Sequence, residues 1–195
     1  EDGAVLADRY TLKRRIASGG MADTWLAHDR RTESDVVLKF ASADPADAPA
    51  ARDLLAREWR IASRLMHPNI VRVFELHDDR EPAFYSQQYL GESNIAVVSG
   101  KAPADCLRPV AMLADALRYA HGKDVVHRDI KADNVLIDSR GLPCLIDFGV
   151  ASARGQAAIR GGGSAVAMSP GQQAGEQPRL ADDIYALGVL MHELL

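Results

Sequence analysis

Residues 127–134 read HRDIKADN, and residues 146–149 read IDFG. Asp129 can accept a proton from an attacking hydroxyl group, while Asn134 and Asp147 can each offer an oxygen to Mg²⁺. Any one of these residues alone would be an ordinary acid or amide in a surface loop. The whole string in this order arises by chance with negligible frequency, so it indicates the chemistry of phosphoryl transfer.

A lysine on an apolar strand is the second feature with chemical meaning. Residues 35–40 read DVVLKF, and the period of two places Val37 and Lys39 on the face opposite the other apolar side chains. An inward lysine needs an anionic partner, because its desolvation costs several kcal/mol. Residues 53–66 predict a helix that carries Glu58 on its apolar face, where a lone carboxylate is also costly. The two residues are therefore expected to form an ion pair. A salt bridge with a purely structural role is the alternative to a functional one.

A glycine-bearing hairpin is predicted near the N-terminus. Residues 10–16 and 24–27 have strand patterns, and the turn between them reads ASGGMA over residues 17–22. Glycine allows backbone N–H groups to approach phosphates closely. Gly-Gly is also common in ordinary hairpin turns, so this segment alone does not decide between the two roles.

Other elements would position these groups. The helix over 53–66 is expected to end before Pro68, which disfavours helix at the residue before it. Gly122 is a plausible helix terminator. The further predicted elements are strands at 70–76 and 84–90, an amphipathic helix at 105–121, and short strands at 134–137 and 143–148.

The composition predicts a soluble protein with a substantial core. The chain has 195 residues, of which 47% are hydrophobic and 26% charged, and no run approaches the roughly 18 apolar residues of a membrane span. The formal charge of −4 argues against a nucleic-acid partner. Cys106 and Cys144 have no metal-ligand spacing, and Cys144 is expected in the core. The N-terminus, without Met, suggests a piece of a longer protein.

The octet, the IDFG string, the inward lysine, the helical glutamate and the HPNIV at 67–71 together resemble a bacterial Hanks-type (eukaryotic-like) serine/threonine protein kinase catalytic domain. The resemblance covers residues 10–195. It implies an α+β, bilobal fold, with a small antiparallel-sheet N-lobe carrying one helix and a mainly helical C-lobe that is incomplete here. Residues 1–90 would form the N-lobe and hinge. Residues 91–195 would form a partial C-lobe with the catalytic loop and the activation segment.

The resemblance also implies roles for individual residues. Lys39 would hold the α- and β-phosphates of ATP, Glu58 would orient Lys39, Asp129 would act on the substrate hydroxyl and Lys131 would contact the γ-phosphate. Asn134 and Asp147 would hold Mg²⁺, with Mn²⁺ as an alternative metal. His127 would be a packing element, and Asp183 would anchor the catalytic-loop backbone. The implied ATP contacts are Ala17, Ser18, Gly19, Gly20, Met21, Thr24, Val37, Lys39, Gln88, Leu90 and Leu136.

Several positions depart from the family pattern. Ala17 and Ala22 replace glycines of the hairpin, Thr24 and Val37 replace the usual Val and Ala above the adenine, and residues 169–171 read SPG in place of Ala-Pro-Glu. The stretch 154–163 has no hydroxyl side chain, so we expect activity without phosphorylation there.

The resemblance leaves three functions to weigh. A serine/threonine protein kinase acting on protein substrates is preferred, a pseudokinase serving as a nucleotide-binding regulatory module is the alternative, and a small-molecule phosphotransferase is disfavoured. The expected location is the cytoplasm, with a membrane tether outside this chain as the alternative. Substrate, activating signal and oligomeric state are not predicted.

Overall fold

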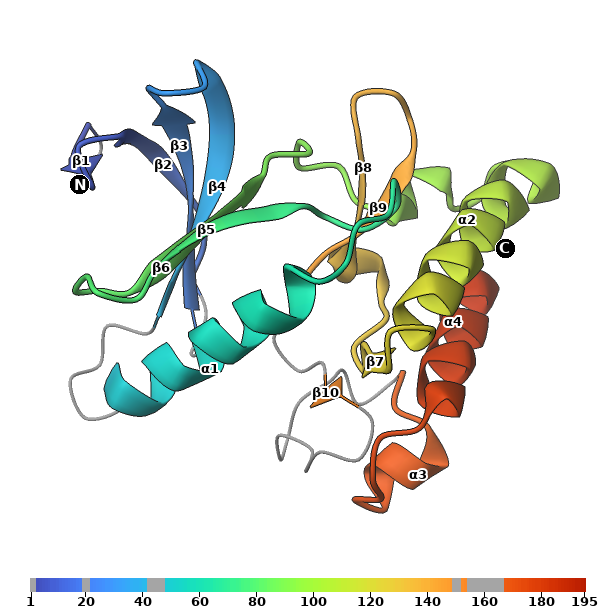
Figure 1. Cartoon of the computed structure of the whole chain (residues 1–195). Coiled ribbons are helices and arrows are strands. Elements are labelled where there is room, and N and C mark those ends of the chain that lie inside the picture. Colours follow the sequence, from blue (N-terminus) through green and yellow to red (C-terminus); the bar gives the residue numbers. More distant parts are fainter. Residues whose placement is uncertain (1–2, 19–21, 42–47, 149–151, 154–166) are drawn as a thin grey trace. The chain divides into compact units, whose positions relative to one another are not determined.

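The computed structural model of the chain describes residues 3–18, 22–41, 48–148, 152–153 and 167–195. The chain divides into two compact units (Figure 1). The first consists of residues 1–63 and 72–89, and the second of residues 64–71 and 90–195.

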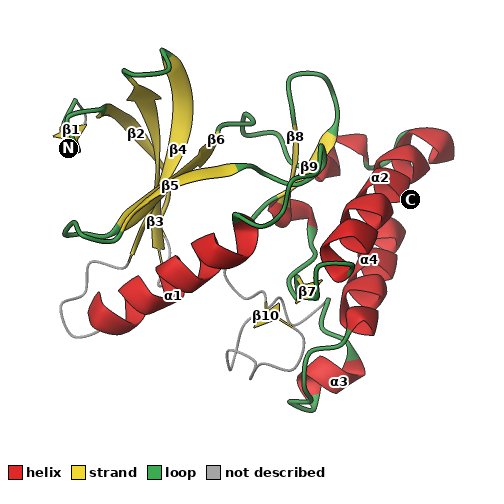
Figure 2. Cartoon of the chain, in the orientation of Figure 1, coloured by secondary structure: helices red, strands yellow, loops and turns green. Residues whose placement is uncertain are grey.

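The first unit is a six-stranded antiparallel sheet with one helix, α1 (Figure 2). The strand order is β1-β2-β3-β4-β6-β5. The bounds are β1 (Val5–Leu6), β2 (Tyr10–Ser18), β3 (Ala22–Asp29), β4 (Ser34–Ala41), α1 (Ala48–Ala62), β5 (Val73–His77) and β6 (Phe84–Gln88). The expected small antiparallel sheet with a single helix is therefore confirmed.

The two faces of this sheet bury different residues, as the alternation on β4 predicts. On one face Val36, Leu38 and Phe40 join an apolar cluster with Tyr10 and Phe84. The opposite face meets α1, in a second cluster built from Ala41, Leu55, Ala83 and Tyr85. Lys39 lies on this second face because it alternates with its apolar neighbours along the strand.

Helix α1 differs from its predicted bounds of 53–66, since it spans Ala48–Ala62. The earlier start accommodates Pro49, which is tolerated in the first turn because its missing N–H would have no helical partner there. At the other end the Ser63 hydroxyl donates to the Arg60 carbonyl oxygen (3.3 Å). Such a side-chain bond competes with continuation of the helix. The chain enters the second unit at the next residue.

Strands β5 and β6 are shorter than predicted. The prediction of a strand over 70–76 is wrong at its start, because Ile70 forms a parallel bridge with Leu145 and the Val71 N–H donates to the Leu145 carbonyl oxygen (2.9 Å). Residues 70–71 thus pair within the second unit. Strand β6 ends at Gln88 rather than at residue 90.

The second unit contains three α-helices and four short strands in its described part. Helices α2 and α4 lie side by side (Figure 1), and the Cys106 thiol of α2 donates to the Leu194 carbonyl oxygen of α4 (3.3 Å). Strand β8 pairs with β9, and β10 with β7, both antiparallel. The bounds are η1 (Ile95–Val98), α2 (Pro103–His121), β7 (Val125–Val126), η2 (Ala132–Asn134), β8 (Val135–Ile137), β9 (Pro143–Leu145), β10 (Ser152–Ala153), α3 (Pro170–Gln173) and α4 (Leu180–Leu194).

Helix α2 confirms its predicted terminator, since Gly122 is its C-cap. The cap has a right-handed φ of −66°, so the position does not require glycine. Cys144 is buried as expected, and burial raises the pKa of its thiol to about 12. No helix among the described residues is both long and apolar enough to cross a membrane.

Candidate active site

The predicted pair of Lys39 and Glu58 forms within the first unit. Lys39 Nζ lies 2.7 Å from Glu58 Oε1, and Glu58 is only 5% exposed. The lysine comes from β4 and the glutamate from α1, so the ion pair joins the helix to the sheet. Each charge supplies the partner that the other needs in an apolar setting.

Sequence reasoning missed a third member of this group. The Tyr85 hydroxyl donates to the same Glu58 Oε1 over 2.8 Å. Tyr85 lies on β6 directly opposite Lys39 of β4. An aromatic residue in a strand is typical of core packing, and only the pairing register between the strands reveals that this one faces the ion pair.

The predicted phosphate hairpin is described in part, because Gly19, Gly20 and Met21 lie outside the described residues. Ala17 and Ser18 end β2 and pair with Thr24 and Asp23 of β3. Ala17 does not have a positive φ. The alanine that replaces a glycine at position 17 therefore causes no backbone strain.

Five further predicted ATP contacts lie among the described residues of the two units. On the first unit Thr24 lies opposite Lys39, and Val37 is buried. The Gln88 N–H donates to the Arg72 carbonyl oxygen (2.8 Å), so this donor is used by the sheet. In the second unit Leu90 and Leu136 belong to one apolar cluster that also contains Val71, Cys144 and Ile146.

The catalytic loop brings Asp129, Lys131 and Asn134 together in the second unit. Asp129 Oδ2 accepts a hydrogen bond from Asn134 Nδ2 (2.8 Å) and lies 3.1 Å from Lys131 Nζ. Asn134 Nδ2 also donates to the Asp129 carbonyl oxygen (2.8 Å). One carboxylate oxygen thus receives two donors, and this fixes the direction in which the aspartate points.

The predicted metal ligands have suitable chemistry. Asn134 uses its Nδ2 on Asp129, so its carbonyl oxygen Oδ1 is the atom that could meet a cation. Asp147 has a φ of 61°, a left-handed conformation that is costly for a non-glycine residue and concentrates at functional sites. No group of three or more His, Cys, Asp or Glu side chains in the described part of the chain is arranged to hold a metal. Mg²⁺ typically takes only one or two carboxylates, with substrate phosphates and water as the other ligands.

Asp183 anchors the catalytic loop, as predicted. Its carboxylate is fully buried and accepts hydrogen bonds from the backbone N–H groups of His127 (2.9 Å) and Arg128 (2.7 Å). His121 Nε2 of α2 lies 2.8 Å from the same carboxylate, a contact that the sequence did not suggest. Arg128 has a φ of 72°, so two N–H bonds hold the backbone where it is strained.

His127 is the predicted packing element. It is fully buried, and its ring lies edge-on to Phe148 with 4.7 Å between the ring centroids. Its Nε2 donates to the Ile146 carbonyl oxygen (3.0 Å), while Nδ1 accepts from the Asp129 N–H (3.3 Å). These partners fit a neutral imidazole that connects the catalytic loop to the segment before Asp147.

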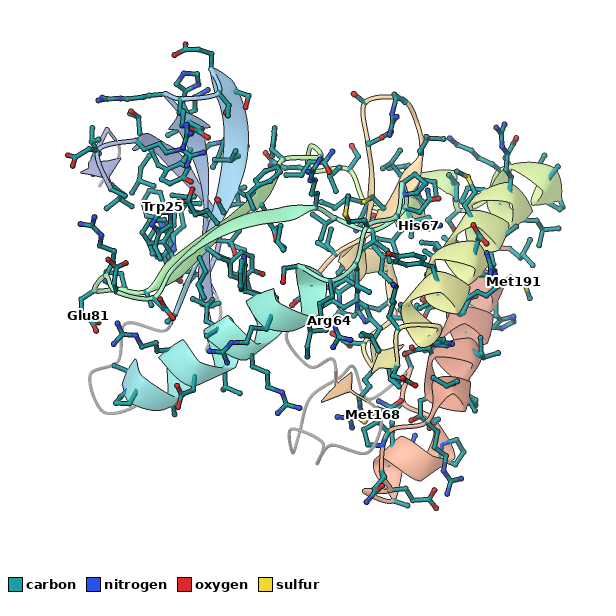
Figure 3. All side chains as sticks on the ribbon, viewed as in Figure 1. Trp25, Arg64, His67, Glu81, Met168 and Met191 are labelled. Carbon is teal, nitrogen blue, oxygen red and sulfur yellow. The ribbon has the colours of Figure 1, made fainter. Side chains whose placement is uncertain are left out.

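A further network fastens the segment after Met168, which is labelled in Figure 3. Ser169 caps α3 by accepting from the Gln172 N–H (3.1 Å), and its hydroxyl donates to Asp182 Oδ1 (2.6 Å). Gln172 Nε2 donates to the Arg128 carbonyl oxygen (3.0 Å), so α3 is bonded to the catalytic loop. Sequence reasoning did not identify Gln172 or Asp182.

Comparison with known proteins finds protein kinases along almost the whole chain. The protein kinase domain family matches residues 10–195. Serine/threonine-protein kinase PrkC of Bacillus subtilis is 32% identical over 201 residues, which cover 99% of this chain and 31% of PrkC. The probable serine/threonine-protein kinase SCO3848 of Streptomyces coelicolor is 33% identical (100% and 31% covered). PknB of Mycobacterium tuberculosis is 31% identical (97% and 33% covered). The chain spans about a third of the length of these relatives.

Proposed function

Because the chain belongs to the protein kinase family, we propose that it transfers the γ-phosphate of ATP to serine or threonine hydroxyl groups of proteins. The observation that carries this proposal is the Asp129 carboxylate, oriented by Asn134 and Lys131 on a loop that Asp183 anchors. Asp129 aligns the attacking hydroxyl and accepts its proton as the new P–O bond forms.

The cations of the site offset phosphate charge. Lys131 lies beside Asp129 and contacts the γ-phosphate, which becomes the transferred group. Lys39 contacts the α- and β-phosphates, and Glu58 fixes the direction of Lys39. The bond that breaks joins the γ-phosphorus to the β–γ bridging oxygen, so ADP leaves with the electron pair.

Asn134 and Asp147 are the proposed ligands of Mg²⁺, with Mn²⁺ as an alternative. Amide and carboxylate oxygens are the ligands that these hard cations prefer. When bound, the cation neutralises charge on the β- and γ-phosphates and orients them for in-line transfer. Asn134 has a double role in this proposal, because its Nδ2 holds Asp129 while its Oδ1 would hold the metal.

Transfer of labelled γ-phosphate to a generic Ser/Thr protein substrate tests the proposal. Asp129→Asn should abolish transfer, since an amide cannot accept the proton. Asp133→Asn is the matched control, because Asp133 is an exposed carboxylate of the same loop. Transfer by the wild type and by Asp133→Asn, with none by Asp129→Asn, supports the proposal. Equal transfer by all three proteins contradicts the role of Asp129.

The same assay tests the alternative, a pseudokinase that binds nucleotide and regulates a partner. The departure at Gly171, where the family carries a glutamate, is the observation that favours it. A folded wild-type protein that binds Mg-ATP yet transfers no phosphate would establish the alternative. For either function we propose a cytoplasmic location, with a membrane tether outside this chain as the alternative, because ATP is abundant there and free thiols such as Cys106 and Cys144 stay reduced.

A further inference from the structure

Tyr85 and Lys39 occupy one face of the sheet at the same level. They are directly paired in the antiparallel register of β4 and β6. Side chains of such pairs point to the same side with their Cβ atoms about 5 Å apart. Helix α1 packs on this face and brings Glu58 over both residues.

Glu58 is consequently held from the sheet by two strands rather than by one. Its Oε1 accepts from Lys39 Nζ (2.7 Å) on β4 and from the Tyr85 hydroxyl (2.8 Å) on β6. Tyr85 is 1% exposed and Glu58 is 5% exposed, so solvent provides little competition for the bond. Hydrogen bonds to a charged group are stronger than those between neutral groups.

Packing of the ring restricts the position of the Tyr85 hydroxyl. Its ring belongs to a buried cluster with Ala41, Ala83 and Leu55, and Trp59 packs against the same cluster. A tyrosine has only two side-chain torsions, so a packed ring fixes its hydroxyl closely. The donor therefore stays aimed at Glu58 whether or not Lys39 is engaged elsewhere.

In protein kinases the ion pair between this lysine and this glutamate must be in place for activity. Phosphorylation of the activation segment is one means of controlling it. Residues 154–163 read RGQAAIRGGG and offer no hydroxyl group to phosphorylate. We propose that Tyr85 is a positioning residue which holds Glu58, and through it Lys39, in the paired arrangement before ATP binds and without a phosphate on residues 154–163. This inference rests on the proposed function, because it assigns Lys39 to the phosphates of ATP.

Tyr85→Phe is the test, because it removes the hydroxyl and keeps the ring. The matched control is Tyr10→Phe, since Tyr10 is fully buried on the opposite face and donates to Ser86 Oγ (3.3 Å) away from the ion pair. Tyr85→Phe should lower kcat/KM for ATP about tenfold, through a higher KM and a smaller change in kcat. Tyr10→Phe should stay within about twofold of the wild type, although both variants lose a buried hydroxyl. Equal kcat/KM in Tyr85→Phe and wild type overturns the proposal.

The dissociation constant of Mg-ATP separates this inference from the proposed function, because binding needs no turnover. If the wild type binds but transfers no phosphate, the proposed function fails. The inference then stands if Tyr85→Phe binds about tenfold more weakly than Tyr10→Phe, and it falls if the two bind equally. A wild type that does not bind Mg-ATP overturns both.

A variant cycle shows whether Tyr85 acts through Glu58. Tyr85→Phe should have no further effect in a Glu58→Ala background, since the acceptor is already gone. A full additional loss in that background would contradict the assigned path.

Discussion

Replacement of Asp183 removes the carboxylate to which the catalytic-loop backbone is fastened. Asp183 is fully buried and accepts the N–H groups of His127 (2.9 Å) and Arg128 (2.7 Å). In Asp183→Ala both buried N–H groups lose their partner, at about 1–3 kcal/mol each. The expected loss is therefore about 2–6 kcal/mol, a large share of a total folding stability of about 5–15 kcal/mol. Asp183→Asn keeps one acceptor oxygen and should cost about half as much.

The rate of phosphoryl transfer should fall as well, because Asp129 follows directly after the two anchored residues. A displacement of about 1 Å in a catalytic group can reduce the rate about 100-fold. Urea unfolding and labelled-phosphate transfer would be measured on Asp183→Ala, Asp183→Asn and the exposed control Asp133→Asn. The control should change stability by no more than about 0.5 kcal/mol. Wild-type stability and wild-type turnover in Asp183→Asn would refute the anchoring argument even if Asp183→Ala fails to fold.

Three further predictions concern stability and reactivity. Ser169→Ala removes the cap of α3 and the hydrogen bond to Asp182 (2.6 Å). It should lower the free energy of unfolding, measured by urea titration, by about 1–3 kcal/mol, and an unchanged urea midpoint would contradict this prediction. Burial raises the pKa of the Cys144 thiol to about 12, so this residue should resist a thiol-directed disulfide reagent at pH 8 in the native protein and react after unfolding. Fast labelling of Cys144 in the native protein would contradict this. The Arg9 guanidinium holds the pKa of the Asp29 carboxyl well below its usual range, so the stabilisation is complete above the unfolded pKa of about 4 and declines as pH falls below it. Asp29→Asn should therefore lose part of the acid sensitivity seen in unfolding midpoints between about pH 2 and pH 5, and an identical pH profile would refute this.

The pairing of Lys39 with Glu58 was predictable because each residue violates the apolar pattern of its own element. A period of two exposes the first violation and a helical period the second. Tyr85 violates no pattern, since tyrosine is a normal strand residue. Its role depends on the register between β4 and β6, which local sequence does not specify.

Element bounds were predicted less well where the chain passes between the two units. The segment of residues 64–71 belongs to the second unit although the first unit continues on both sides of it. Its partner, Leu145, lies far along the chain and pairs with Ile70 and Val71. Periodicity in 70–76 could not reveal this, because an apolar run looks alike in either unit.

One of the departures in the hairpin, Ala17, brings no backbone strain. Replacing glycine by alanine is harmful where the backbone needs a positive φ, and Ala17 does not have one. The absence of hydroxyl groups in residues 154–163 would matter if Glu58 depended on a phosphate there. Tyr85 supplies a donor to Glu58 from within the same unit, so that dependence need not exist.

Gly171 stands where the protein kinase family has a glutamate. That glutamate would fasten the segment before α4, and here α3 is fastened in another way. Ser169 donates to Asp182 (2.6 Å), and Gln172 donates to the Arg128 carbonyl oxygen (3.0 Å). Both acceptors are buried, so these bonds meet little competition from water. These two bonds fasten α3 to α4 and to the catalytic loop without a glutamate at position 171.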